Sequence, residues 1–300
     1  MSKRLPVNKD NKFCYDIVYE HDFSHLTEEL NQLDFNLQDK KICIITDSNV
    51  EKLYLNELSN LLAKSCISVS SFTFEAGEES KNLTTVQNVY EFLIRNKFNR
   101  KDLLIALGGG VVGDLTGFCA ATYLRGIDFI QIPTTLLALV DSSIGGKTGV
   151  DFSQYKNMVG AFHMPRLVYM NLSVLNDLPG RQYFAGMAEV LKSALIKDGK
   201  FYEWLINSFY EICQREPEYM EEMIYKTNQI KKEIVEKDPF EKGDRALLNF
   251  GHTLGHAIEK YKNFKLLHGE CVALGCICAA FISWKRDLIS SDDYYEIRDM

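Results

Sequence analysis

The sequence lacks a long hydrophobic run, an excess of positive charge and a cysteine pair with metal-binding spacing. Its longest apolar stretch, residues 271–284, is shorter than the about 20 residues that span a bilayer, so we expect a buried helix and no membrane partner. The first residues, MSKRLPVNKDNK, lack the apolar core of a secretory signal, which predicts a cytoplasmic protein. A formal charge of −7 argues against a nucleic-acid partner, because such proteins need a basic face.

The eight cysteines are scattered along the chain, and several, such as Cys43, Cys119 and Cys271, lie inside apolar runs. Cys276 and Cys278 do not have the C-x-x-C spacing of a metal or redox site. We therefore expect reduced thiols packed in the core, as is usual for cytoplasmic proteins.

A hydrophobic content of 46% with 25% charged residues is typical of a folded globular chain. In its first half, short β-branched runs at 41–46, 68–74, 102–107 and 129–132 alternate with helical patterns, which predicts a parallel sheet. From about residue 178, helical patterns follow at 182–197, 201–213, 219–235, 247–261 and 270–286. We predict an α/β, Rossmann-like nucleotide-binding domain (1–177) and an all-α metal- and substrate-binding domain (178–300), with the active site in the cleft between them.

A glycine-rich turn follows the third predicted strand. Gly108, Gly109, Gly110 and Gly113 come directly after the run at 102–107 and precede a helical pattern. Backbone amides in such a turn, together with the positive helix N-terminus, bind phosphate. Asp47 ends an earlier strand and is suited to ribose hydroxyls, an order that differs from the usual dinucleotide fingerprint. A tight turn without a ligand is the alternative.

Three of the six histidines fall within 17 residues. His252 and His256 lie four residues apart, on one face of a predicted helix, and His268 starts the next one. Glu189 lies on an apolar helix face, where a carboxylate needs a cation. Glu189 with two of the three histidines would form a divalent metal site with open positions; the alternative is a set of unrelated surface histidines.

In the segment 133–149 a glycine pair presents Lys147, and further basic residues along the chain add positive charge to an acidic protein. Each of them alone is typical of a solvated surface. Together they could enclose a doubly anionic substrate. The residues of this group are Arg125, Lys147, Lys156 with Asn157, Lys192, Lys231 and Arg245.

Four segments, in this order, resemble signatures of the 3-dehydroquinate synthase family: 108–114, 133–149, 186–192 and 248–256. The resemblance implies one Zn²⁺ or Co²⁺ per subunit on Glu189, His252 and His268. It implies an NAD site formed by Asp47, Glu78, Lys81, Gly109, Gly110, Asp114, Thr134, Thr135, Asp141, Lys147 and Lys156. It implies a homodimer whose substrate phosphate meets Lys147, Asn157, His256 and, from the neighbouring subunit, Arg125. It implies a substrate carboxylate site of Lys231, Arg245 and Asn249, with Lys192 near the ring hydroxyls.

The implied activity converts 3-deoxy-D-arabino-heptulosonate 7-phosphate to 3-dehydroquinate and phosphate in the shikimate pathway. NAD takes a hydride, phosphate leaves by β-elimination, the hydride returns and an aldol step closes the ring, so the enzyme is a lyase.

Two features depart from the family pattern: Asn176-Asp177 replaces a usual threonine, and family members continue beyond Met300 with a further phosphate-binding lysine. The alternatives are another sugar-phosphate cyclase, a polyol dehydrogenase of the same fold such as glycerol dehydrogenase, and a truncated inactive remnant.

Overall fold

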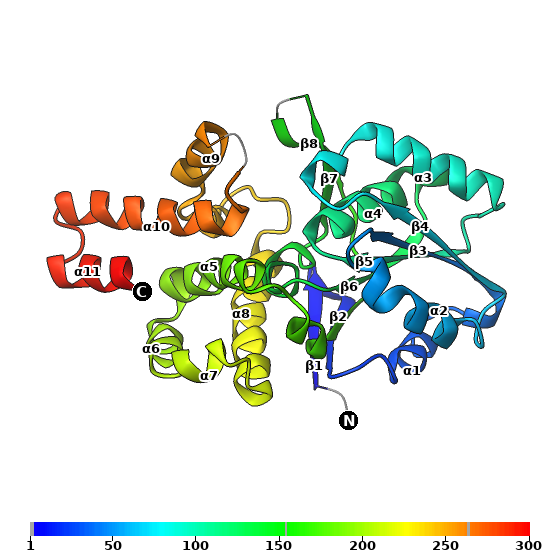
Figure 1. Ribbon diagram of the computed structural model, residues 1–300, viewed down its shortest axis with the longest axis horizontal. Coiled ribbons are helices and arrows are strands. Elements are labelled where there is room, and N and C mark those ends of the chain that lie inside the picture. The colour runs from blue at the N-terminus through cyan, green and yellow to red at the C-terminus, as the bar shows by residue number, and fades with distance from the viewer. Residues whose placement is uncertain (1–2, 154, 263–264) are drawn as a thin grey trace. The chain divides into compact units, whose positions relative to one another are not determined.

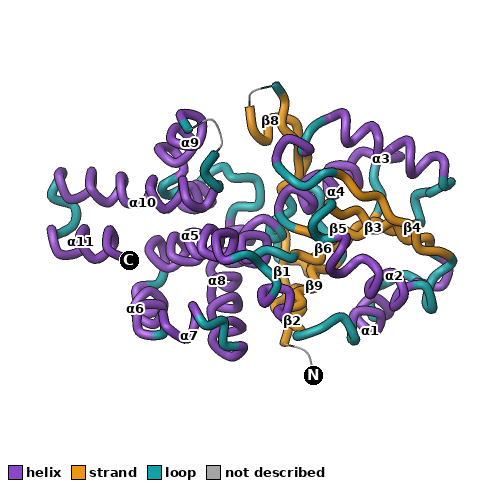
Figure 2. Tube along the Cα trace, viewed as in Figure 1, coloured by secondary structure: helices purple, strands orange, loops and turns teal. Residues whose placement is uncertain are grey.

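The computed structural model of the chain describes residues 3–153, 155–262 and 265–300. The chain forms two compact units, one ending at Val174 and the other starting at Leu175. Figure 1 follows the chain through the two units in colour, and Figure 2 distinguishes helices from strands. Within the described residues, no helix is both long and apolar enough to cross a lipid bilayer.

The first unit is built on a seven-stranded sheet with the order β1-β2-β9-β6-β5-β3-β4. Its strands are β1 (Lys3–Lys9), β2 (Lys12–Glu20), β3 (Lys41–Asp47), β4 (Ser68–Phe74), β5 (Leu103–Gly108), β6 (Asp128–Pro133) and β9 (Leu167–Asn171). Only the β1–β2 pair is antiparallel among these described strands; the other neighbours are parallel. The predicted α/β class with a parallel sheet is therefore confirmed.

The central strands are buried on both faces, as their unbroken apolar runs predict. All six residues of β5 are buried, and so are the five central residues of β3. The helices of this unit are α1 (Leu26–Asn31), α2 (Asn56–Leu62), α3 (Leu83–Arg95) and α4 (Gly110–Thr122), with a π-helical turn at Glu51–Leu55 before α2. α3 and α4 pack with β3 and β5 in one hydrophobic core, which includes Cys43 and Cys119. This core fixes the carboxyl end of β5 and the start of α4.

Five strands of the first unit were not predicted from the sequence. The polar N-terminal segment forms β1 and the start of β2, joined by Asp10 and Asn11, which both have positive φ. Such a two-residue turn suits the twist of an antiparallel hairpin. β9 pairs with β2 and β6, and β7 (Lys147–Phe152) and β8 (Tyr155–Phe162) form a separate antiparallel pair that packs on α4.

The second unit consists, in its described elements, of helices. They are α5 (Gly180–Lys197), α6 (Gly199–Asn207), α7 (Phe209–Cys213), α8 (Pro217–Lys237), α9 (His252–Tyr261), α10 (His268–Lys285) and α11 (Ser291–Asp299), with a 3-10 segment at Asp244–Asn249.

Two helices predicted as continuous are interrupted. The prediction for 201–213 is wrong at Ser208, where α6 ends and α7 begins. The prediction for 247–261 is wrong at Gly251, which adopts a left-handed conformation with φ of 78°. A side chain there would place its Cβ 2.5 Å from Sγ of Cys276, so this close approach requires glycine.

The apolar stretch 271–284 forms a helix, as predicted, but the expectation that it is buried is only half correct. α10 packs against α9, α5 and α11. Cys271, Val272 and Cys276 are buried on this side, whereas Phe281 and Ile282 are more than 40% exposed. An apolar sequence shows that a helix has apolar faces, and only its neighbours decide which of them are covered.

Candidate functional site

The predicted nucleotide-binding turn lies where β5 passes into α4. Gly109 caps α4 and Gly110 begins it, so the helix amino end opens from this turn. A Cβ at Gly109 would lie 3.1 Å from Thr135 Cγ2, and one at Gly110 would lie 3.0 Å from Ser142 Oγ. The absence of these side chains lets the turn lie against the segment after β6. Backbone amides at such a helix start attract phosphate groups.

Thr134 and Thr135 follow β6 at the same edge of the sheet. The backbone N–H of Thr134 donates to the Gly108 carbonyl oxygen, with the two atoms 3.0 Å apart. Oγ1 of Thr135 accepts from the N–H of Ala138, and Asp141 lies in the π-helical turn that follows. The structure thus brings both threonines to the glycine turn, as parallel strands require of residues at their carboxyl ends.

Asp47 ends β3, the strand beside β5 in the sheet. Its Oδ1 accepts hydrogen bonds from the N–H groups of Asn49 (2.9 Å) and Val50 (3.1 Å). The carboxylate therefore orders the turn into the next helical segment and remains at the carboxyl edge of the sheet.

Lys81 is the centre of a polar cluster beside α4. Its side chain is buried, and Nζ donates to Oδ2 of Asp114 at 2.7 Å and to Oδ1 of Asn157 at 2.6 Å. Burial alone would lower the pKa of Lys81, but Asp114 and Glu78 outweigh this effect and raise it. The lysine is therefore charged at neutral pH. Oε1 of Glu78 also lies 3.4 Å from Nζ of Lys156, a residue near the start of β8.

Lys147 and Asn157 are carried by the β7–β8 pair, Lys147 at the start of β7. Both are exposed. Asn157 has a positive φ of 56°, and its N–H donates to Oδ1 of Asp151 at 2.8 Å. The side chain of Asn157 therefore rests on a locally fixed backbone.

Arg125 lies at the far end of α4 from the polar cluster of Lys81, Asp114 and Asn157. It follows the carboxyl end of α4, whereas Asp114 lies in the first turns of the same helix. Asp114 and the helix end at Thr122 are eight residues apart, which corresponds to about 12 Å along α4. Leu124 and Arg125 both have positive φ and both are exposed.

In the second unit, α5, α9 and α10 bring Glu189 and three histidines together. One ring nitrogen of each of His252, His256 and His268 lies within 4.8 Å of the other two, a spacing that fits one metal ion. Oε1 of Glu189 lies 3.7 Å from Nε2 of His252 and 3.7 Å from Nε2 of His268. Two ligand sets therefore overlap, one of three histidines and one of Glu189 with His252 and His268.

The second ring nitrogens distinguish these two sets. Nδ1 of His252 lies 3.2 Å from the carbonyl oxygen of Phe250, which can only accept, so Nδ1 carries the proton and Nε2 keeps its lone pair. Nδ1 of His268 faces Oε2 of Glu259 at 3.8 Å. Both Nε2 atoms therefore face Glu189 with an acceptor behind the ring, the usual arrangement around metal-binding histidines. Burial lowers the pKa of His252, which favours the neutral, metal-binding form.

Glu189 itself is 1% exposed. Its carboxylate contacts the ammonium of Lys192, yet neither oxygen makes a well-formed hydrogen bond within the described residues. A buried carboxylate in this state is a suitable ligand for a divalent cation.

Glu259 was missed by the sequence analysis. It is buried on α9, seven residues after His252 and three after His256. The i, i+4, i+7 spacing of His252, His256 and Glu259 places Glu259 on the histidine face of the helix, and this spacing was the available signal.

The predicted substrate-binding cations of this unit lie on elements that pack against one another. Lys192 is on α5, Lys231 on α8 and Arg245 on the 3-10 segment, and all three side chains are buried. Nη1 of Arg245 donates to the carbonyl oxygen of Pro239 at 2.7 Å. Asn249, in contrast, is exposed and donates to Oε1 of Glu241 at 2.9 Å.

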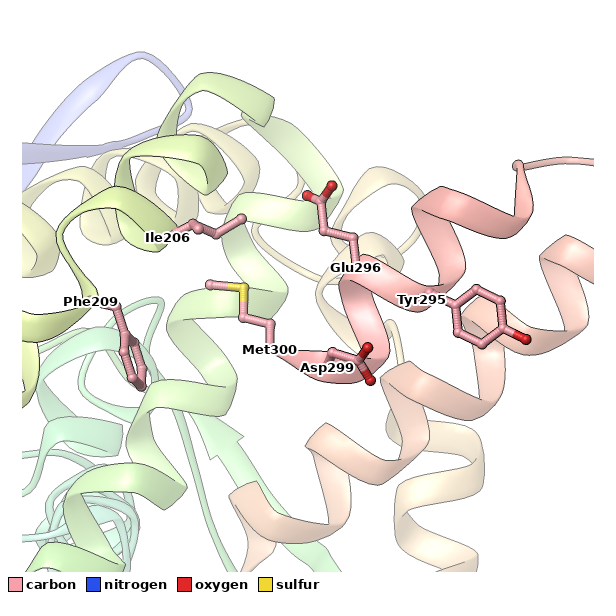
Figure 3. A pocket seen from close by; sticks show the side chains of 6 residues that line it. All are labelled: Ile206, Phe209, Tyr295, Glu296, Asp299 and Met300. Carbon is pink, nitrogen blue, oxygen red and sulfur yellow. The ribbon is translucent and has the colours of Figure 1, made fainter.

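A cavity of about 410 Å³ lies elsewhere in this unit, between α6, α7 and α11. Figure 3 shows Ile206, Phe209 and Met300 around it, with Glu296 and Asp299 on α11. None of its lining residues was predicted for the site. With two carboxylates and no cation among these lining residues, the cavity does not suit an anionic substrate.

Comparison with known sequences gives matches along the chain. The 3-dehydroquinate synthase N-terminal family model matches residues 71–185, and the C-terminal one matches residues 186–300. A 3-dehydroquinate synthase of Acetivibrio thermocellus is 43% identical over 296 residues, which are 99% of this chain and 81% of that protein. One of Clostridium kluyveri is 48% identical over 84% of this chain and 70% of its own length.

Solved structures give the same fold. A 2-deoxy-scyllo-inosose synthase complexed with carbaglucose-6-phosphate, NAD⁺ and Co²⁺ superposes with a TM-score of 0.87 at 31% identity, covering 99% of this chain and 79% of its own. A 2-epi-5-epi-valiolone synthase from Streptomyces hygroscopicus with NAD⁺ and Zn²⁺ gives 0.87 at 27% identity, with coverages of 98% and 81%. A glycerol dehydrogenase from Schizosaccharomyces pombe, at 15% identity and a TM-score of 0.68 over 98% of this chain and 76% of its own, shares the fold alone.

Proposed function

The chain belongs to the 3-dehydroquinate synthase family, and we propose from this premise how its residues carry out the reaction. The reaction converts 3-deoxy-D-arabino-heptulosonate 7-phosphate to 3-dehydroquinate and phosphate in the shikimate pathway. The observation that carries the proposal is the buried Glu189 carboxylate, faced at 3.7 Å by one nitrogen of each of two histidines.

We assign a divalent cation, Zn²⁺ or Co²⁺, to Glu189, His252 and His268. The donor set fits, because three protein ligands with open positions are typical of catalytic zinc. The acceptors behind both histidines, Phe250 and Glu259, support the same choice. His256, exposed on the same helix face, is then left for the substrate.

We assign NAD to the first unit. The glycine turn at Gly109 and Gly110 suits its pyrophosphate, and Asp47 lies at the same sheet edge for a ribose. The remaining residues of this assignment are Glu78, Lys81, Asp114, Thr134, Thr135, Asp141, Lys147 and Lys156. When bound, the cation would polarise the reacting hydroxyl group, and NAD would accept the hydride and return it.

The chain's own groups orient the anionic substrate and stabilise its charge. Lys231 and Arg245 are buried cations on elements that pack against each other, and two such groups suit the binding of a substrate carboxylate. Asn249 borders this set, and Lys192 lies beside Glu189, where it would meet the ring hydroxyls. Lys147, Asn157 and His256 are exposed and would donate to the phosphate.

A homodimer completes the proposal. Lys81 joins Asn157 to Asp114, and about 12 Å of α4 separates Asp114 from the helix end that Arg125 follows. Arg125 and Asn157 would therefore meet one phosphate more readily from different subunits. The β7–β8 pair exposes Phe152, Tyr155 and Met158, each by more than 50%, which suits a surface that a partner covers. The cytoplasmic location of the protein stays a prediction from its sequence.

Turnover at limiting NAD tests the function. With Zn²⁺ present and NAD at about one hundredth of the substrate, phosphate release and NADH absorbance are followed together. Many phosphates per NAD without net NADH are expected, because the hydride returns within each cycle. One NADH per turnover would indicate a polyol dehydrogenase, and the absence of phosphate release would indicate an inactive remnant.

A further inference from the structure

The Asn157 side chain has its orientation set by Lys81. An ammonium group can only donate, so the side-chain atom of Asn157 that lies 2.6 Å from Nζ must be the amide oxygen. The amide group is planar, and its NH₂ group therefore points away from Lys81. Asn157 is thus held as a hydrogen-bond donor toward its exposed side, which is the role that an anion requires.

Lys81 is itself fixed from several directions. Nζ also donates to Asp114 at 2.7 Å, and the carbonyl oxygen of Lys81 accepts from the N–H of Asp151 at 2.8 Å. Asp151 in turn accepts the N–H of Asn157. The same lysine therefore anchors both the backbone and the side chain at the β7–β8 turn, and it links them to the first turns of α4.

We propose that Lys81 is a positioning residue for phosphate recognition, which holds the Asn157 amide so that its NH₂ group donates to the substrate phosphate. The proposal rests on the proposed function, in which Asn157 meets that phosphate. Lys81 would then have two functions: it would contribute to the NAD site, and it would orient Asn157 for the substrate phosphate. The Asp114–Lys81–Asn157 chain then connects the helix start assigned to NAD with the phosphate donor.

A double-mutant cycle on the protein saturated with NAD and Zn²⁺ tests this role. The KM for 3-deoxy-D-arabino-heptulosonate 7-phosphate, which the enzyme turns over, and the inhibition constant of the same sugar acid without phosphate are measured from phosphate release. Lys81→Met should weaken binding of the phosphorylated compound by about tenfold or more, with little effect on the other. In an Asn157→Ala background, Lys81→Met should cause almost no further loss, because its effect passes through that amide.

Two further variants guard against a purely structural effect. Asn157→Asp, at an exposed position, should accept from Lys81 as before, lose the donor and weaken phosphate binding more than Asn157→Ala does. Lys41→Met removes a lysine of the same unit that donates to the Asn96 and Lys97 carbonyls, and its effect should add to that of Asn157→Ala. Equal losses from Lys81→Met in both backgrounds would overturn the positioning role alone. Failure of the unmodified protein to bind the phosphorylated compound would overturn the proposed function and this role with it.

Discussion

At the scale of residues, the groups that face the two nitrogens of each imidazole ring indicate which histidines are suited to bind the metal. His252 and His268 each present Nε2 to Glu189, and each has an acceptor facing Nδ1. His256 shares the cluster by distance, but its ring is exposed. Distance alone therefore leaves two ligand sets open, and the protonation pattern favours the one with the carboxylate.

Replacing the ligands one at a time separates these sets. We expect Glu189→Gln and His268→Ala to weaken Zn²⁺ binding by more than about 100-fold, because each removes one of three ligands. His256→Ala should keep Zn²⁺ affinity within about tenfold, since it acts on the substrate side. Metal content after dialysis and calorimetric titration measure this. Loss of metal in His256→Ala with retention in Glu189→Gln would assign the site to the three histidines.

The carboxylate behind His268 should tune metal affinity without touching the ion. We expect Glu259→Gln to lower Zn²⁺ affinity by about 10- to 100-fold, because a neutral amide orients the ring less strongly. Competition with a chelator measures the change, with circular dichroism as a check of folding. The exposed neighbour Lys262→Ala serves as the control and should not change the affinity. Equal affinities for Glu259→Gln and the unmodified protein would remove Glu259 from the metal's surroundings.

At the scale of elements, the segment between α8 and α9 positions Arg245 through one carboxylate. Asp238 accepts from the N–H groups of Lys242 (2.9 Å), Gly243 (2.7 Å) and Arg245 (3.1 Å). These backbone hydrogen bonds, with the Lys242 one contributing most, lower the pKa of Asp238 below its ordinary 3.8. The segment is therefore ordered by the ionised form.

This depressed pKa predicts how the segment responds to acid. The stabilisation is complete above pH 3.8 and is lost as pH falls through the lower pKa of the folded state, because protonation removes the charged acceptor. Hydrogen exchange of the Lys242, Gly243 and Arg245 amides should show protection that disappears over this range. Asp238→Asn should exchange faster and without this pH dependence. An identical pH profile in both proteins would show that another group orders the segment.

At the scale of the whole molecule, the main consequence of the proposed dimer is a shared active site. An Arg125 that serves the neighbouring subunit makes each site depend on two chains. The substrate-side cations Lys231 and Arg245 belong to the other unit of the chain. In the proposed dimer, each active site therefore takes Lys231 from one chain and Arg125 from the other, and variants at these two positions impair contributions from different chains.

Mixing two inactive variants tests this dependence. Arg125→Ala and Lys231→Met, refolded or co-expressed as mixed dimers, should regain about a quarter of the unmodified activity, because half the dimers are mixed and each has one intact site. Each variant alone is the control and should stay inactive at matched concentration. Phosphate release measures the recovery. If Arg125 acted within its own chain, no mixed dimer would have an intact site and no activity would return.

The sequence by itself determined the features that depend on neighbours along the chain. The buried runs of β3 and β5, the glycine turn into α4 and the spacing of His252, His256 and His268 are local patterns, and the four signature segments are continuous stretches. They were sufficient for the fold class, the family and the candidate metal ligands.

Only the tertiary structure decided what depends on residues far apart in the chain. β9 lies between β2 and β6 because of long-range pairing, and the missed β1–β2 hairpin joins the sheet through it. The role of Glu259 depends on how α9 packs on α10, and Asn157 meets Lys81 across 76 residues. Local periodicity has no information on such contacts, since they arise only when separate elements share one core or one polar cluster.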